Sequence, residues 1–148
     1  MEIIDYLDSD LVFFLKADNR DQALKEMVDI LHSSGKVEDS DVFYQAVLER
    51  EKIVSTGIGM GIAIPHAKLP SYDHFFIAIG ILAKGVDWTA LDDAPVRLIF
   101  LLGGPDDKQT EYLQILSNLT MTIKDEALRK KLLTFGPKDD IIELFHPQ

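Results

Sequence analysis

The sequence predicts an α/β fold in which a single mixed β-sheet is sandwiched by helices on both faces. Two long apolar runs, "FFIAIGILAKGVDW" (residues 75–88) and "PVRLIFLLGG" (residues 95–104), are typical of central strands that are covered on both faces. Helix patterns precede and follow these runs, and helices that alternate with buried strands favour an α/β sandwich. With 148 residues, 47% of them hydrophobic, the chain can bury a core as one domain over residues 1–148.

The start of the chain predicts one strand and one helix. The run "LVFFL" at residues 11–15 is typical of a buried strand. Asn19 is a suitable N-cap for the helix that follows, and Gly35 is a suitable stop. Between these two positions apolar residues recur at helical spacing, at Ala23, Leu24, Met27, Val28 and Leu31.

A second helix and a short strand are expected next. The helix begins at Asp39 or Ser40 and continues to Glu51, and the strand occupies residues 62–64. The apolar positions that we expect on one face of this helix are Val42, Phe43, Ala46 and Val47.

The last part of the chain predicts a loop and three helices. The glycines and the proline at residues 103–105 are expected to form the loop that leaves the second long strand. Amphipathic helices are expected over residues 108–123 and 125–135, and a short last helix over residues 138–145.

The composition excludes several classes of partner and chemistry. The net charge of −10, from 15 basic and 25 acidic residues, repels phosphate backbones, so no nucleic-acid partner is expected. The lack of cysteine excludes disulfides, thiolate nucleophiles and cysteine-ligated zinc. The longest apolar run, residues 75–83, is too short to cross a bilayer, and the acidic N-terminus does not resemble a signal peptide. We therefore expect a cytoplasmic protein without direct membrane insertion.

The segment "STGIGMGIAIPHAKLP", which begins at Ser55, is an awkward way to build a core, because glycine weakens a strand and proline ends its ladder. Gly57, Gly59 and Gly61 leave a bare backbone whose amides can approach an anion, and Ser55 and Thr56 add hydroxyl donors. The segment has no Gly-Lys-Ser/Thr and precedes a strand instead of opening a helix, so it fits neither a Walker loop nor a Rossmann fingerprint. We predict a phosphate-binding loop of another kind.

His66 is the candidate nucleophile of this segment. Pro65 stiffens the chain before it, and the imidazole is expected at a strand end beside the glycine loop. A neutral imidazole has one free ring nitrogen and a pKa of roughly 6.5, so it is a competent nucleophile at cellular pH. Arg50, near the end of the second helix, can offer forked donors to phosphate oxygens.

Each of these features also has a simpler interpretation. A lone histidine in a loop is most often a polar surface residue, and a glycine cluster is most often a turn. Arg50 could merely neutralise a helix C-terminus, where a cation is favoured. The functional interpretation depends on the convergence of these features within seventeen residues, from Arg50 to His66.

The same residues carry a resemblance to a known family. Glu51 is followed after six residues by Ile58-Gly59, and after two more by Ile62-Ala63-Ile64-Pro65-His66-Ala67. This pattern resembles the phosphorylation-site signature of EIIA domains of the phosphotransferase system (PTS), in the fructose/mannitol class that includes the nitrogen-regulatory EIIA proteins. The resemblance extends over nearly all the chain, including "LERE" before the glycines and "PV" at the start of the second long strand.

The resemblance implies a function, its partners and its site residues. His66 would accept a phosphoryl group from the phosphohistidine of HPr or a related carrier and pass it to a cysteine or histidine of an EIIB component, while a membrane EIIC carries the sugar. Arg50 matches the family arginine that stabilises the phosphoryl group during transfer. The resemblance implies no metal or other cofactor, and His66 and His74 are too weak a pair to propose a metal site.

Tyr112 departs from the family pattern. Family members usually carry a second histidine at the start of the helix after the long strand, where this chain has Tyr112. A phenol can hydrogen-bond the imidazole or a phosphate oxygen, but it carries no positive charge. We therefore expect slower or weaker phosphoryl transfer, which Tyr112→His would speed up unless Tyr112 only forms a wall of the site. His74 is a less favoured substitute for the missing charge.

Two other functions are open. The missing second histidine and the lack of a fused EIIB or EIIC favour a nitrogen-type regulatory EIIA, which binds target proteins according to its phosphorylation state. A metal-independent hydrolase with His66 as base is less favoured, because the sequence offers no nucleophile beyond Ser55. Adjacent EIIB and EIIC genes would indicate transport, and a sigma-54 context would indicate regulation.

Overall fold

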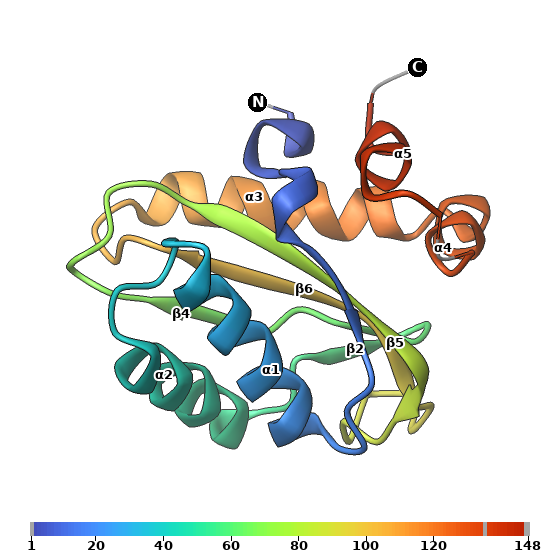
Figure 1. The fold of residues 1–148 in the computed structure, drawn as a ribbon, viewed down its shortest axis with the longest axis horizontal. Coiled ribbons are helices and arrows are strands. Elements are labelled where there is room, and N and C mark those ends of the chain that lie inside the picture. The colour runs from blue at the N-terminus through green and yellow to red at the C-terminus, as the bar shows by residue number, and fades with distance from the viewer. Residues whose placement is uncertain (1, 135, 147–148) are drawn as a thin grey trace.

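A computed structural model of the protein describes residues 2–134 and 136–146. Within these residues lies one six-stranded mixed sheet, shown in Figure 1. Its strands are β1 (Val12–Leu15), β2 (Gly57–Gly59), β3 (Ile62–Ala63), β4 (His66–Lys68), β5 (Phe76–Val86) and β6 (Val96–Gly104). The strand order is β1-β5-β6-β3-β2, and β4 also pairs with β6. The pairs β5–β6 and β2–β3 are antiparallel, whereas β1–β5, β3–β6 and β4–β6 are parallel.

Helices cover both faces of this sheet. The chain begins with two 3₁₀ turns, η1 (Ile3–Tyr6) and η2 (Ser9–Leu11), and continues with the helices α1 (Arg20–Ser33), α2 (Ser40–Ile53), α3 (Gln109–Ile123), α4 (Glu126–Leu132) and α5 (Lys138–Glu143). Figure 1 shows α1 and α2 on one face and α3, α4 and α5 on the other. The predicted fold class is therefore confirmed. No helix in the described part of the chain is long and apolar enough to span a membrane.

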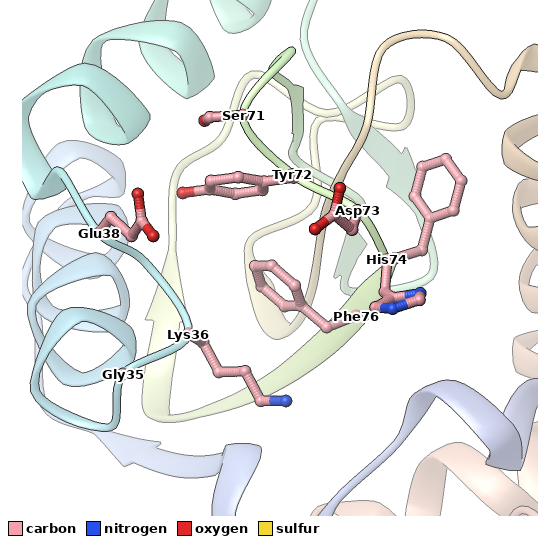
Figure 2. A pocket seen from close by; sticks show the side chains of 9 residues that line it. Gly35, Lys36, Glu38, Ser71, Tyr72, Asp73, His74 and Phe76 are labelled. Carbon is pink, nitrogen blue, oxygen red and sulfur yellow. The ribbon is translucent and has the colours of Figure 1, made fainter.

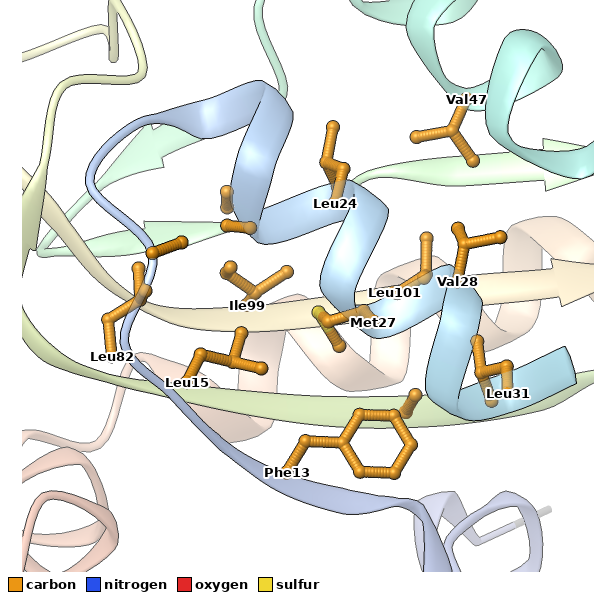
Figure 3. Packing of buried hydrophobic residues seen from close by; sticks show 14 of the residues in the cluster. Phe13, Leu15, Leu24, Met27, Val28, Leu31, Val47, Leu82, Ile99 and Leu101 are labelled. Atoms are coloured by element: carbon orange, nitrogen blue, oxygen red, sulfur yellow. The ribbon is translucent and has the colours of Figure 1, made fainter. Parts of the chain in front are cut away.

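Each face of the sheet has its own hydrophobic core. On one face Leu24, Met27 and Val28 of α1 pack toward the sheet, as Figure 3 shows. On the other face Ile115 and Leu119 of α3 belong to the second core. Successive residues of β5 and β6 point to opposite cores, because side chains alternate along a strand. This double burial explains why both strands are continuous apolar runs.

The predicted helix starts are confirmed, with one error in a core position. The Asn19 side chain caps α1, and the Asp39 side chain caps α2 by accepting a hydrogen bond from the Val42 amide at 3.1 Å. Val42 itself was expected in the core, but 51% of its surface is exposed. The buried stripe of α2 follows Phe43 and Val47, one helical turn apart, and Val42 lies beside that stripe.

Two glycine-rich segments are strands, contrary to the sequence-based prediction. Gly103 and Gly104 end β6 instead of forming the loop into α3. Glycine is needed at these two strand positions because a side chain would collide with the ring of Phe76 or Phe75. Residues 57–59 form β2, which pairs with β3 as a hairpin. The sheet thus uses the missing side chains for close packing.

The helices near the C-terminus are shorter than predicted. The helix expected over residues 125–135 is α4, which ends at Leu132, and the last residue of the prediction, Phe135, lies outside the described residues. The helix expected over residues 138–145 is α5, which ends at Glu143.

Candidate phosphoryl-transfer site

His66 begins β4 at the edge where this strand pairs with β6. Its Cα is in register with Leu102, and the Leu102 amide donates to the carbonyl of Pro65 at 3.0 Å. The Nδ1 atom of His66 lies 3.2 Å from the carbonyl oxygen of Ile64. Because a carbonyl can only accept, Nδ1 carries the proton of a neutral imidazole, and the lone pair is on Nε2. Nε2 is therefore the nucleophilic atom.

Arg50 lies beside this nitrogen. Its Nε donates a hydrogen bond to His66 Nε2 at 3.1 Å, and one terminal nitrogen donates to the carbonyl of Val54 at 2.9 Å. The second bond fixes the guanidinium against the C-terminal end of α2. A guanidinium has five N–H donors, so these two bonds leave others for an anion that approaches Nε2.

The surroundings of His66 favour its neutral form. Burial lowers the pKa of the imidazole below its ordinary value, the Ile64 carbonyl opposes this shift, and the positive charges of Arg50 and Lys68 lower the pKa further. A lowered pKa keeps the lone pair on Nε2 unprotonated at neutral pH. The site thus presents a nucleophile beside cations that can bind the oxygens of a phosphoryl group.

Tyr112, from the first turn of α3, forms a wall of the same site. Its ring centroid lies 5.5 Å from that of His66 at an interplanar angle of 56°, and it also packs against Phe75, with a ring-centroid distance of 6.2 Å. Burial raises the pKa of the phenol, with an opposing effect from Arg50, so the hydroxyl keeps its proton at neutral pH. Tyr112 is therefore a rigid neutral ring with an O–H donor.

These side chains enclose a pocket of about 470 Å³ at the protein surface. The pocket is large enough for a phosphoryl group, and His66 is only half buried in it. The lining residues are Ala46, Arg50, His66, Ala67, Lys68, Tyr112, Leu113 and Leu116.

Lys68 is a site residue that sequence reasoning missed. Its Nζ lies 4.1 Å from the centroid of the Tyr112 ring and donates to the Gln109 side-chain oxygen at 2.9 Å. A signal for it exists in the sequence, because residues two apart on a strand point to the same side. The pair His66 and Lys68 on a single strand would have indicated a shared surface.

The predicted glycine loop does not lie at this pocket. The Ser55 hydroxyl donates to the Trp88 carbonyl at 2.7 Å and accepts from the Gly57 amide at 3.0 Å, so it joins the start of the hairpin to the loop between β5 and β6. The hairpin tip carries Gly59 and Gly61, whose φ angles of 96° and 76° suit the turn. These residues serve the hairpin's own geometry.

The tip is also far from His66, and an acidic side chain lies against it. The Gly61 carbonyl accepts from the Leu98 amide, whereas His66 is in register with Leu102, four residues further along β6 and about 13 Å away at roughly 3.3 Å per residue. Hydrogen bonds from the backbone amides of Ala94 and Met60 hold the pKa of Asp92 below its usual value, so its carboxylate is charged at the tip. That charge would repel a phosphate.

Glu51, the residue after Arg50, is buried and ties α2 to the hairpin. It accepts from the Thr56 amide at 3.1 Å, from the Thr56 hydroxyl, and from the Trp88 indole at 3.2 Å. Thr56 is therefore a structural partner of Glu51 and its hydroxyl is not directed at an anion. This network fixes the end of the helix that presents Arg50.

His74 lies outside the His66 pocket. It stands in the segment before β5 and lines a different pocket, between that segment and the loop after α1 (Figure 2). Its side chain is exposed. In the described part of the chain, no group of three or more histidine, aspartate and glutamate side chains could hold a metal ion.

The known proteins that this chain resembles identify its family. The family model of the phosphoenolpyruvate-dependent sugar phosphotransferase system, EIIA 2, matches residues 5–147. The chain belongs to this family. EIIA domains are phosphotransferases that carry a phosphohistidine intermediate, so the predicted family and the predicted class of activity are confirmed.

Individual relatives agree with this assignment. The chain spans only 21% of the length of the PTS fructose-specific EIIABC component of Bacillus subtilis, to which it is 36% identical over 132 residues, or 89% of this chain. It is 36% identical over 122 residues to the PTS fructose-specific EIIA component of Haloferax volcanii, which covers 82% of this chain and 79% of that protein. The crystal structure of nitrogen regulatory protein IIA-Ntr from Neisseria meningitidis matches with a TM-score of 0.88 at 26% identity, over 97% of this chain and 99% of that one.

Proposed function

We propose that His66 is the phosphoryl acceptor of this EIIA protein. It takes the group from the phosphohistidine of an HPr-type phosphocarrier and passes it to an EIIB component. The observation that carries the proposal is the position of Nε2, which has its lone pair beside the Arg50 guanidinium in an open pocket. A relay fed by phosphoenolpyruvate starts in the cytoplasm, and we propose that location for the protein.

The transfer step follows from the arrangement of these atoms. Nε2 attacks the phosphorus of the donor phosphohistidine, the new P–N bond forms as the donor's P–N bond breaks, and the electron pair of the broken bond returns to the donor imidazole. Nδ1 keeps its proton throughout and donates it in a hydrogen bond to the Ile64 carbonyl. Arg50 moves its donors from Nε2 to the phosphoryl oxygens, where about −1.5 to −2 charges must be stabilised.

A phosphorelay assay tests this proposal. The protein is incubated with phosphoenolpyruvate, the PTS enzyme I and HPr, and its mass is measured intact. We expect the wild type to gain one phosphoryl group and His66→Ala to gain none, whereas the exposed-site control His74→Ala should behave like the wild type. Failure of the wild type to gain the group, or equal labelling of His66→Ala, would overturn the proposal.

A regulatory role is the second candidate, and the high TM-score to the nitrogen regulatory protein of Neisseria meningitidis favours it. In that role, the same phosphorylation of His66 would decide which target proteins the chain binds. A pull-down that compares the phosphorylated wild type with His66→Ala tests it: a target retained by one form only supports regulation. Neighbouring EIIB and EIIC genes, together with identical partners for both forms, would count against it.

A further inference from the structure

Lys68 is a half-buried lysine whose ammonium contacts neutral groups. Its Nζ lies over the Tyr112 ring and donates to the side-chain amide oxygen of Gln109. Among the described residues no ion pair neutralises it. By contrast, each of four lysines elsewhere on the surface pairs with a carboxylate, namely Lys25, Lys52, Lys84 and Lys130. The charge of Lys68 is therefore available to a ligand of the pocket.

We propose that Lys68 is the second cation of the phosphoryl site and that its Nζ binds an oxygen of the phosphoryl group on His66. This inference rests on the proposed function, because it requires His66 to become phosphorylated. The two residues stand at the first and last positions of β4, so their side chains leave the strand on the same side. Both contact the ring of Tyr112 and both line the same pocket.

The two cations reach the pocket from different elements. Arg50 belongs to α2, on one face of the sheet, whereas the Lys68 ammonium lies against Tyr112 and Gln109 of α3, on the other face. A phosphoryl group on Nε2 has three oxygens, and one guanidinium cannot surround them. A cation from the α3 side complements the one from the α2 side.

The Tyr112 ring holds this ammonium in place. The ring is only 6% exposed and packs against Phe75, so it is a fixed surface, and an ammonium over its face is attracted by the ring electrons. Of the three N–H donors of Nζ, one is used by Gln109, and the others can turn to a phosphoryl oxygen. Tyr112 thus positions a positive charge that its own side chain cannot carry.

The chemistry of the step is unchanged by this addition. The P–N bond of the donor breaks and the P–Nε2 bond forms, while Lys68 keeps all its protons and turns a free N–H donor to a phosphoryl oxygen. Because the oxygens carry their charge both in transfer and in the phosphohistidine, Lys68 stabilises both the transition state and the product. Its loss should therefore slow phosphorylation and shorten the lifetime of phosphohistidine at His66.

The test uses phosphoramidate, a small donor that requires no docking surface. Phosphorylation of His66 is followed by intact mass in the wild type, Lys68→Met, Lys68→Arg and the control Lys84→Met. Lys84 is a strand lysine as well, and its change removes the same charge. It lies near the C-terminal end of β5, whereas the N-terminal end of β5 is the one near β4. We expect Lys68→Met to react about tenfold more slowly, as for the loss of one charge-assisted hydrogen bond, and Lys68→Arg to recover most of the rate.

A titration of His66 separates an electrostatic effect from a structural one. The pKa of the imidazole, measured by NMR of the ring nitrogens, should rise in Lys68→Met and stay unchanged in Lys68→Arg and Lys84→Met. Loss of packing would not be repaired by arginine in this way. Tyr112→His gives a cross-check, because the new imidazole should speed phosphorylation more in the Lys68→Met background than in the wild type.

Each outcome decides between the two proposals. Equal rates for Lys68→Met and the wild type, with the label on His66, would overturn the role of Lys68 and leave the proposed function intact. A defect seen with phospho-HPr but absent with phosphoramidate would assign Lys68 to partner docking and also overturn the inference. No label on the wild type with either donor would overturn both.

Discussion

The His66 pocket and the β2–β3 hairpin lie along the same edge of the sheet, yet they use their polar groups in opposite ways. In the pocket, the cations of Arg50 and Lys68 line an open space beside a nucleophilic nitrogen. Beside the hairpin, the polar groups are paired with other parts of the protein, as shown by the hydroxyls of Ser55 and Thr56, which donate to Trp88 and Glu51. Density of polar and glycine residues in sequence therefore does not by itself indicate a site.

What distinguishes the two regions is the availability of charge. A phosphoryl group needs donors that are held in place but not neutralised, and the neutral partners of Arg50 and Lys68 meet this requirement. At the hairpin tip the Asp92 carboxylate accepts from the Met60 amide and so occupies a donor that an anion would need. Substitutions in the pocket should thus affect transfer, and substitutions in the hairpin should affect stability.

The largest expected effect on transfer is that of Arg50→Ala. Removing the guanidinium that contacts Nε2 should slow phosphorylation of His66 by phospho-HPr by roughly 10²–10³-fold, the usual loss for one preorganised donor to a reacting anion. Quench-flow with intact-mass detection measures the rate. Arg50→Lys should recover only part of it, because an ammonium lacks the forked geometry.

Lys52→Ala is the matched control for this comparison. Lys52 is a cation in the same last turn of α2, but its side chain is exposed and pairs with Glu49. Its loss should leave the transfer rate unchanged. Equal rates for Arg50→Ala and Lys52→Ala would mean that Arg50 only caps the helix through the Val54 carbonyl.

Glu51→Ala should show the opposite behaviour, with a large loss of stability and a small effect on chemistry. The change leaves the Thr56 amide, the Thr56 hydroxyl and the Trp88 indole without their buried acceptor, which should lower the free energy of unfolding by about 2–4 kcal/mol. Urea unfolding followed by fluorescence of Trp88 measures it. Glu51→Gln keeps one acceptor oxygen, so its free energy of unfolding should lie between those of the wild type and Glu51→Ala.

Transfer measured well below the unfolding midpoint completes this test. Folded Glu51→Ala should phosphorylate His66 within a few-fold of the wild-type rate, because Arg50 keeps its bond to the Val54 carbonyl. Wild-type stability in Glu51→Ala would show that the buried network does not hold the hairpin to α2.

The fold could be predicted largely from the sequence because its signals are local. Continuous apolar runs located the long strands β5 and β6, and the cap residues Asn19 and Asp39 located the starts of α1 and α2. Val42 was misplaced because an apolar residue beside a helical stripe is indistinguishable from one on it by spacing alone. The face of the sheet on which each helix packs could not be predicted from local patterns, because it depends on the order of all the strands.

The site was only partly predictable because it depends on pairing between distant strands. Arg50 and His66 were assigned to one site because Arg50 matches the family arginine, and their hydrogen bond agrees with this assignment. The glycines were assigned to the same site because they are close in sequence, but β3 and β4 pair with different stretches of β6, so the hairpin tip lies four residues along β6 from His66. Lys68 was missed because the predicted strand ended at residue 64, so His66 and Lys68 were not placed on one strand, as they are in β4.

Gly59→Ala tests whether the hairpin tip contributes to stability alone or also to phosphoryl transfer at the His66 pocket. Its φ of 96° is strained for alanine, and a Cβ would lie 3.1 Å from an Asp92 carboxylate oxygen, so the free energy of unfolding should fall by about 1–3 kcal/mol. Phosphorylation of His66 should be unchanged. Gly61→Ala meets no atom closer than 3.7 Å and should lose less stability. A lower transfer rate without a loss of stability would mean that the hairpin does contribute to the phosphate site.

The smallest expected effect is the dependence of stability on pH that comes from His66. Its pKa is lowered on folding, mainly by burial, so the folded state disfavours the protonated ring. The contribution is therefore fully present above the unfolded pKa of about 6.5 and is lost as the pH falls through that value toward the folded pKa. Urea unfolding at about pH 7.5 and about pH 5.5 should show a smaller loss of stability in His66→Gln than in the wild type, because glutamine does not titrate. Equal losses in both proteins would mean that the imidazole is as easily protonated in the folded pocket as in the unfolded chain, and that the neutral nucleophile is not favoured by its surroundings.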